Sequence, residues 1–297
     1  MPELPEVETV RRGLEKLVIS KKVLDVKILN EKSFQASRND IKAFLFDSKI
    51  TKIRRRAKVL IIDLSSKYSL VIHLKMTGQI VFRGDKDWAA GHPTDSFVAD
   101  LPDRSTRIQF DLSGNAKLFF NDQRKFGWVK LLPTLEVENI DFLKKVGPEP
   151  LTGDSKLPAQ FLKNIRRRNG TTIKAAILDQ TVVAGIGNIY ADESLFAAGI
   201  HPATRVRDLS DSQLKKVLDC AIKIMQKSID SGGSTMKNYI RADGTKGNYL
   251  EKFAQVFRRE GQSCPKCGGE IIKIRVAGRG THICPICQKH FSIDKSA

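Results

Sequence analysis

The sequence has no apolar run as long as a membrane span requires. None of its stretches approaches the about 20 consecutive apolar residues of a transmembrane helix. Its first residues are acidic and are interrupted by Pro2 and Pro5, the reverse of a secretory signal. We therefore expect a cytoplasmic protein without membrane association.

Acidic residues are scarce relative to basic ones. The chain has 33 Asp and Glu residues against 51 Lys and Arg residues, which gives a formal net charge of +18. Such a charge favours a polyanionic partner, because each phosphate that a cation neutralises releases condensed counterions. Nucleic acid is the first candidate, and the alternative is a basic surface that only keeps the protein soluble.

Cysteine is also rare, and four of the five cysteines fall in two C-x-x-C pairs. Cys264 and Cys267 form the first pair, Cys284 and Cys287 form the second, and sixteen residues separate the pairs. In a reducing compartment this spacing favours one structural, tetrahedral Zn²⁺ over disulfides. Cys220 lies apart from them, beside the apolar face of an expected helix, and fits a small core residue.

The residues between these cysteines predict a zinc-held hairpin. The tail over residues 264–297 is too short to bury much core, so metal binding would supply its folding energy. Strands are expected over 271–276 and 282–284, which leaves residues 278–280 at the tip. Arg279 would then be a fixed cation for a DNA groove.

Hydrophobic patterning predicts a separate N-terminal domain. Val7, Val10, Leu14 and Leu17 recur at helical spacing after Pro5, so a helix is expected close to the chain start. Strand-like runs follow at residues 23–29, 59–64, 70–74, 108–112, 117–120 and 127–132, with a turn at 113–115. This pattern predicts a β-sandwich or barrel over residues 1–134.

Helical periodicity dominates the second half of the chain. Residues 133–158 are rich in Pro and Gly and only weakly periodic, so we place the linker at 135–152. A helical domain is expected over residues 153–263, in which a capping box from Ser210 to Gln213 opens one helix. The zinc finger completes the chain.

Two helical runs flank a glycine-bearing turn in the middle of this helical domain. Gly185 and Gly187 would let the backbone approach a ligand closely, and Asn188 is expected at the N-cap, where the helix dipole suits a phosphate. An ordinary helix connection has the same pattern. Neighbouring cations, Arg168 and Lys174 among them, favour binding of a DNA backbone.

Pro2 follows Met1, and removal of Met1 would expose a secondary amine. An α-amino group titrates near ~8, about two units below lysine, so more of it is a neutral nucleophile at physiological pH. Such an amine can attack a sugar C1′ and form an iminium, while Glu3 could act as a general acid on the ring oxygen. A frayed terminus is the alternative.

Seven segments taken together resemble bacterial formamidopyrimidine-DNA glycosylases. In chain order they are PELPEVET (2–9), RRAK (55–58), HLKMTG (73–78), DQRKFG (122–127), LDQ (178–180), GIGNIYADE (185–193) and GRGT (278–281). The resemblance implies an α+β fold in which a β-sandwich with a leading helix, a helix-two-turn-helix domain and a C-terminal β-hairpin zinc finger follow one another. It also implies a monomer that binds double-stranded DNA containing oxidised bases or abasic sites, between the two large domains.

The activity implied by this resemblance is removal of oxidised purines, chiefly 8-oxoguanine and formamidopyrimidines, followed by β- and δ-elimination. Pro2 would be the nucleophile and Glu3 the proton donor to the sugar. Lys58 would be the general acid of β-elimination, and Arg279 would donate in δ-elimination. Apart from the resemblance, Lys58 fits a phosphate-facing charge.

The resemblance also implies a set of DNA contacts. Met76, Arg124 and Phe126 match a wedge that fills the base stack after the damaged base is extruded, although core packing is the alternative for Met76 and Phe126. Further expected contacts are Arg168, Lys174, Asn188 and His73. A lesion-capping loop is expected over 231–239, with Ser234, Thr235, Lys237 and Tyr239.

Some positions depart from the pattern of this family. Residues 104–107 lack a Lys-His pair that relatives often have, a basic residue near Asn169 is absent, and Lys75 stands where many relatives have Gly or Arg. Residues 85–102 are expected to form a longer loop than usual, without an assigned purpose.

Two other functions remain as alternatives. An enzyme similar to endonuclease VIII would prefer oxidised pyrimidines, but Leu4 argues against it because that branch typically has Gly there. A catalytically silent DNA-binding protein would keep only the DNA-binding domains and the zinc finger. The intact set of Pro2, Glu3, Lys58 and Arg279 argues against this alternative.

Overall fold

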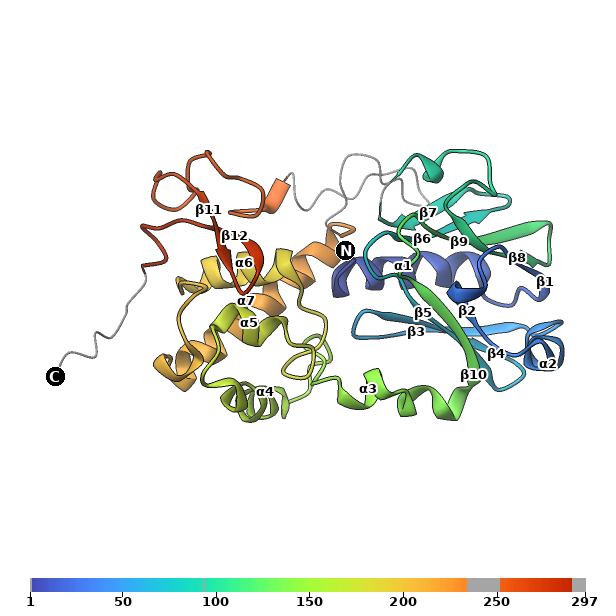
Figure 1. Cartoon of the computed structure of the whole chain (residues 1–297), viewed down its shortest axis with the longest axis horizontal. Coiled ribbons are helices and arrows are strands. Elements are labelled where there is room, and N and C mark those ends of the chain that lie inside the picture. Colours follow the sequence, from blue (N-terminus) through green and yellow to red (C-terminus); the bar gives the residue numbers. More distant parts are fainter. Residues whose placement is uncertain (1, 93, 234–251, 290–297) are drawn as a thin grey trace. The chain divides into compact units, whose positions relative to one another are not determined.

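The computed structural model describes residues 2–92, 94–233 and 252–289. These residues form two compact units, one made of 2–144 with 229–233 and the other of 145–228 with 252–289 (Figure 1). Within the described ranges, no helix combines the length and the apolar composition needed to cross a membrane.

The first unit is a β-sandwich of two five-stranded sheets. In sheet order, the first sheet contains β1 (Val23–Ile28), β8 (Thr106–Leu112), β9 (Ala116–Asp122), β6 (Gly78–Arg83) and β7 (Trp88–Gly91). The second contains β2 (Phe34–Gln35), β10 (Trp128–Pro133), β5 (Tyr68–His73), β4 (Val59–Leu64) and β3 (Ile50–Arg56). All pairs are antiparallel except β2 with β10. The sandwich is therefore confirmed over the barrel.

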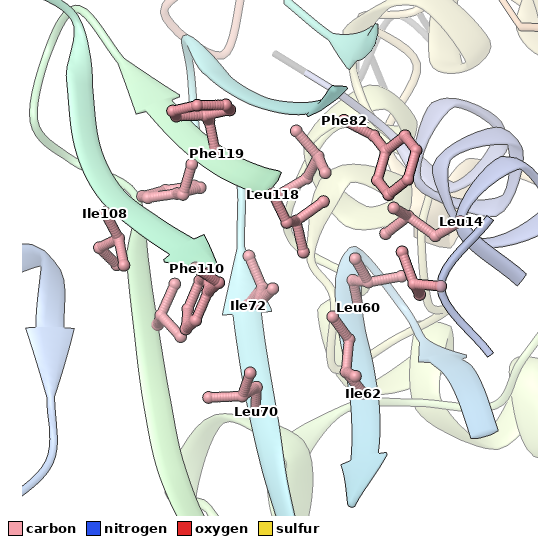
Figure 2. Packing of buried hydrophobic residues seen from close by; sticks show 14 of the residues in the cluster. Leu14, Leu60, Ile62, Leu70, Ile72, Phe82, Ile108, Phe110, Leu118 and Phe119 are labelled. Carbon is pink, nitrogen blue, oxygen red and sulfur yellow. The ribbon is translucent and has the colours of Figure 1, made fainter. Parts of the chain in front are cut away.

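Apolar side chains from both sheets meet in one core. Leu60 and Ile72 on the second sheet lie in the same cluster as Phe110 and Leu118 on the first (Figure 2). Each of these side chains is at most 2% exposed. Their removal from water supplies the main driving force for stacking the sheets.

Helix α1 (Leu4–Val18) closes one open side of the sandwich. It packs against β3 and β7, the edge strands of the two sheets (Figure 1). Val7, Val10 and Leu14 are fully buried, as their helical spacing predicts. The helix thereby covers two strand edges that would otherwise expose unpaired backbone groups.

The segment expected as a long loop, residues 85–102, contains one of these edges. It includes β7 and a 3-10 turn, η3 (Asp95–Phe97). Trp88 on β7 is 3% exposed and packs on α1 so closely that a Cβ at Gly13 would lie 2.3 Å from the ring atom Cζ2. The segment therefore has a structural purpose, which is to hold the leading helix.

The second unit is helical and ends in a hairpin. Its main helices are α4 (Leu157–Ile165), α5 (Ile173–Leu178), α6 (Asn188–Ala198) and α7 (Asp211–Asp230), and its strands are β11 (Ile272–Val276) and β12 (Arg279–Ile283). The shorter elements of the whole chain are η1 (Glu31–Ser33), α2 (Arg38–Asp40), η2 (Ile41–Leu45), η4 (Thr134–Asn139), α3 (Asp141–Lys145), η5 (Arg166–Arg168) and η6 (Val206–Asp208).

The capping box predicted at the start of α7 is confirmed. The Ser210 N–H donates to Gln213 Oε1 at 2.8 Å, and the Gln213 N–H donates to Ser210 Oγ at 3.2 Å. The two side chains thus satisfy backbone groups that the first helical turn leaves without partners.

We predict that Gly13→Ala destabilises the protein although it removes a helical glycine. Alanine gains about 1 kcal/mol in helix propensity, but displacement of the buried Trp88 ring costs about 1–3 kcal/mol, so the net effect should be a loss. Equilibrium unfolding in urea measures it. Trp88→Phe should reduce the cost of Gly13→Ala in a double-mutant cycle, and a stabilising Gly13→Ala would refute the packing argument.

Candidate functional site

The start of α1 holds Pro2 and Glu3 in place. Both residues are buried, and the Glu3 N–H donates to Glu6 Oε2 at 2.8 Å, which is one half of a capping box. Glu3 is the N-cap residue of the helix, and its side chain is 3% exposed. Pro2 and Glu3 are therefore ordered by the helix, which argues against fraying of these two residues.

Lys58 lies in the turn between β3 and β4, and α1 is tied to that turn. Arg55 Nη1 donates to the Ala57 carbonyl at 3.0 Å, and Arg55 Nε lies 3.2 Å from Glu8 Oε2 on α1. Ala57 has a φ of 51°, so its backbone needs such support. The Glu8–Arg55 contact connects the helix that carries Pro2 and Glu3 with the turn that carries Lys58.

Glu8 remains charged in this partly buried position because three arginines surround it. Burial alone would raise the pKa of the Glu8 carboxyl, but hydrogen bonds and charges from Arg11, Arg12 and Arg55 outweigh it and lower the pKa. Their guanidinium nitrogens lie 3.0 to 3.2 Å from the carboxylate. Charge-assisted contacts of this kind are stronger than neutral hydrogen bonds.

His73, at the end of β5, is a neutral side chain. Burial, followed by the charges of Lys75 and Lys58, lowers the pKa of His73 to about 3. Its Nδ1 accepts the Lys75 N–H at 3.0 Å, so the ring proton resides on Nε2. Val59 pairs with His73 across the sheet, which brings His73 beside the Lys58 turn.

Two neighbouring turns carry the residues expected to form a wedge. Met76, in the turn between β5 and β6, is half-buried, and Phe126, between β9 and β10, is 52% exposed. The Arg124 guanidinium carbon lies 4.8 Å from the centroid of the Phe126 ring. Core packing, the alternative for Phe126, is therefore wrong.

The four cysteines of the second unit form a metal centre. Their Sγ atoms all lie within 4.8 Å of one another, and all four thiols are free of disulfides. The Cys264–Cys287 and Cys267–Cys284 sulfur distances are 3.8 and 3.4 Å. A tetrahedron with Zn–S bonds of about 2.3 Å has sulfurs about 3.8 Å apart, so the donor set fits one structural Zn²⁺.

Lys174 is not a surface cation, and the expectation that it contacts DNA is wrong. Its side chain is fully buried, and Nζ lies 2.6 Å from Asp192 Oδ1, 2.7 Å from Thr281 Oγ1 and 3.2 Å from the Gly280 carbonyl. An ammonium has three protons, and these three acceptors use them. Lys174 therefore fastens helices α5 and α6 to strand β12.

Asp192 completes this buried connection. Its Oδ2 accepts the His282 N–H at 2.9 Å, while its other oxygen pairs with Lys174. The next residue, Glu193, accepts backbone N–H groups from Gln255, Val256 and Phe257. Sequence reasoning assigned no role to either carboxylate, because nothing in the GIGNIYADE segment distinguishes a buried acid from an exposed one.

Arg279 and Asn188 occupy positions slightly different from those expected. Arg279 is the first residue of β12, paired with Val276, so the tip consists of Ala277 and Gly278. Arg279 is exposed. The N-cap of α6 is Gly187, and Asn188 is the first helical residue, whose Nδ2 donates to the Gly280 carbonyl at 3.0 Å.

Arg168 is partly occupied by an internal partner. Its Nη2 lies 2.7 Å from Asp179 Oδ2, and its side chain is 44% exposed. It can still face an external phosphate, although with part of its charge neutralised. The expected lesion-loop residues Ser234, Thr235, Lys237 and Tyr239 lie outside the described residues.

Together, the fold and the cysteine centre define a β-sandwich protein with a helical second unit and a zinc finger. Three family descriptions match in succession: the formamidopyrimidine-DNA glycosylase N-terminal domain over residues 1–129, its H2TH domain over 146–239, and a zinc finger found in FPG and IleRS over 261–289. The chain belongs to the formamidopyrimidine-DNA glycosylase family.

Known relatives agree over nearly the whole chain. The formamidopyrimidine-DNA glycosylase of Pelotomaculum thermopropionicum is 40% identical, with 97% of this chain and 99% of the relative covered, and that of Streptococcus mutans is 38% identical with 97% and 100% covered. A structure of Lactococcus lactis Fpg with DNA containing an abasic site has a TM-score of 0.84 at 34% identity, covering 97% of this chain and 100% of the other.

We predict that Glu8→Gln destabilises the protein by about 1–3 kcal/mol at pH 7, because it removes a charged acceptor from three arginines. A carboxyl whose folded pKa is lowered stabilises above its unfolded pKa and loses that contribution as pH falls through the folded value. The difference between variant and parent should therefore vanish well below pH ~4. Urea unfolding at several pH values measures it.

Glu15→Gln is the matched control, because Glu15 also pairs with Arg11, at 2.9 Å, but its side chain is 48% exposed. It should cost no more than about 0.5 kcal/mol. A Glu8→Gln penalty that is the same at pH 3 and pH 7 would show that packing, not charge, is what the substitution removes.

We predict that Lys174→Met leaves the salt dependence of DNA binding unchanged. A lysine on a phosphate contributes nearly one counterion to the slope of log K against log salt, whereas the buried Lys174 should contribute none. Loss of its charge should instead destabilise the protein by about 3–5 kcal/mol, because Asp192 stays buried without its cation. Adding Asp192→Asn should recover part of the lost stability. If Lys174→Met reduced the slope of log K against log salt by about one, Lys174 would be a phosphate contact after all.

Proposed function

We propose that the chain is a bifunctional DNA glycosylase and abasic-site lyase that acts on oxidised purines, namely 8-oxoguanine and formamidopyrimidines, in double-stranded DNA in the cytoplasm. The observation that carries this proposal is the buried start of α1, where Pro2 and Glu3 precede a helix tied to the Lys58 turn. Similar structures include a Lactococcus lactis FPG mutant with Fapy-dG containing DNA and MutM with carbocyclic 8-oxo-G containing DNA, which supports this choice of substrate.

The nucleophile in this proposal is the amine of Pro2 after removal of Met1. Its lone pair forms a bond to the sugar C1′ while the bond from C1′ to the damaged base breaks, and the proton that the Pro2 nitrogen then loses goes to the departing base. Glu3 donates a proton to the ring oxygen, so the sugar opens and an iminium forms between Pro2 and C1′.

Strand cleavage follows from the electron demand of this iminium. It acidifies the C2′ proton, and loss of that proton expels the 3′ phosphate in β-elimination. Lys58 donates a proton to the oxygen of the leaving 3′ phosphate in this step, and Arg279 assists the expulsion of the second phosphate. The four zinc finger cysteines would hold the β11–β12 hairpin, in which Arg279 is the first residue of β12. A bound Zn²⁺ would supply folding energy and would have no open coordination position.

The wedge of Met76, Arg124 and Phe126 fills the gap that the extruded base leaves. An exposed aromatic ring on a turn is suited to insertion between base pairs, and a guanidinium over that ring can reach the orphaned partner base. His73, Asn188 and Arg168 contact the backbone in this proposal. In the DNA-free protein the pKa of His73 is lowered and its Nδ1 is already an acceptor, so the Nε2–H is the group that can donate a hydrogen bond to a phosphate.

We predict that the enzyme forms a covalent adduct at the Pro2 nitrogen when borohydride is added during reaction with a duplex that contains 8-oxoguanine. Reduction converts the iminium into a stable amine, and mass spectrometry of the digested complex locates it. Glu3→Gln should lose excision of the intact damaged base but keep cleavage at a preformed abasic site. An N-terminally extended protein is the control, because its Pro2 nitrogen is an amide without a basic lone pair.

Several outcomes would contradict this proposal. An adduct on Lys58 with Pro2 unmodified would transfer the nucleophile to that lysine. Faster excision of oxidised pyrimidines than of 8-oxoguanine would favour the endonuclease VIII type, and binding without any nicking would indicate a silent DNA-binding protein.

A further inference from the structure

Asp122, the last residue of β9, is a buried carboxylate to which the mechanism above gives no role. Its side chain is fully buried, and both of its oxygens accept hydrogen bonds. The donors come from the two turns that carry the wedge residues. A buried carboxylate is costly unless donors surround it, so its partners are strongly constrained to stay in place.

The first of these turns is the one that Asp122 itself begins. Its Oδ2 accepts the Gly127 N–H at 2.6 Å, and its Oδ1 accepts the Arg124 N–H at 3.2 Å. Lys125 lies between them with a φ of 58°, a conformation that needs external support. One carboxylate thus closes the turn on both sides, and Arg124 and Phe126 are exposed on it.

The second turn is linked to the first through Thr77. The Thr77 hydroxyl donates to Asp122 Oδ1, and Thr77 Oγ1 in turn accepts the Arg124 N–H at 3.0 Å. Thr77 follows Met76 directly. The Gly78 N–H donates to the Leu74 carbonyl at 2.9 Å, so the turn that contains Met76 is itself closed.

The main chain of Asp122 is anchored in the sheet. Its N–H donates to the Ser105 carbonyl at 2.8 Å, and its carbonyl accepts from Arg107 Nε at 2.8 Å. Arg107 is itself only 8% exposed. The Asp122 carboxylate therefore has a fixed position on the sandwich. Both turns are hydrogen-bonded to it, in addition to the contact between Thr77 and Arg124.

We infer that Asp122 is a positioning residue for base extrusion, and that it acts by holding Met76 and the Arg124–Phe126 pair in the geometry in which they enter the base stack. This inference rests on the proposed function. A wedge that is already ordered does not have to lose turn freedom while it displaces a paired base. An abasic site has no base to displace, so its cleavage should depend little on this order.

The test compares Asp122→Asn, Thr77→Val and Thr77→Ser under single-turnover conditions, with one duplex that contains paired 8-oxoguanine and one that contains a preformed abasic site. Asparagine presents an NH₂ group to one of the turn donors, and valine removes the hydroxyl link at nearly constant volume. Both should slow excision by about tenfold or more, the factor expected for a lost charge-assisted hydrogen bond. Abasic-site cleavage should change less than about twofold, and Thr77→Ser should behave as the parent.

Combination with Phe126→Ala tests whether the two residues act on one step. Phe126→Ala alone should show the same split between the two substrates. Adding Asp122→Asn to it should then slow excision by less than the product of the single effects, because the wedge is already lost. Fully multiplicative effects would overturn the inference.

Two further results would overturn it without affecting the proposed function. One is an equal slowing of both substrates by Thr77→Val, which indicates general damage to the fold. The other is unchanged amide hydrogen exchange over residues 123–127 in DNA-free Asp122→Asn, which would show that the carboxylate does not hold the turn. A parent protein that excises no 8-oxoguanine would instead refute the proposed function, while the exchange measurement would still test the turn.

Discussion

The burial of α1 against the edges of both sheets is the constraint on which the proposed chemistry depends. A nucleophile at a chain terminus would ordinarily be among the most mobile groups of a protein. Here Val7, Val10 and Leu14 of α1 are fully buried, and Trp88 packs against Gly13 from the edge strand β7. Because the helix is fixed along its length, the residues that precede its first turn are fixed as well. Apolar burial of the helix would thereby also place the Pro2 nitrogen for the proposed reaction.

In both units, buried or partly buried carboxylates fix turns and helices to neighbouring elements. Glu8 joins α1 to the β3–β4 turn through Arg55, Asp122 joins two turns, and Asp192 joins two helices to β12 through Lys174. Each of them accepts several directed hydrogen bonds, and each would be costly to leave with fewer. Directed contacts of this kind fix loops to a definite geometry, which apolar packing alone does less well.

The parts of the fold that follow from periodic patterns could be predicted from the sequence. The leading helix, the capping box at Ser210 and the cysteine centre depend on residues close together or at regular spacing, and all three are present. The strand-like runs of the sequence do not include β2, β3, β6 or β7. Strand β3 has the mostly polar sequence ITKIRRR, and β7 lies within an irregular stretch. Strand β7 is an edge strand that pairs with β6, and no local sequence pattern reveals this pairing.

The role of an individual cation depends on the fold in the same way, whereas the net charge depends on composition alone. Lys174 and Arg168 are equally basic in the sequence, but Asp192 takes up the charge of the first entirely, and Asp179 shares that of the second. Arg54 and Arg166 are likewise paired, with Asp63 and Asp211. The excess of +18 still favours a polyanion, because each internal pair removes one charge of each sign. The fold decides which lysines and arginines can contact phosphate, because it determines which of them are paired with acidic residues.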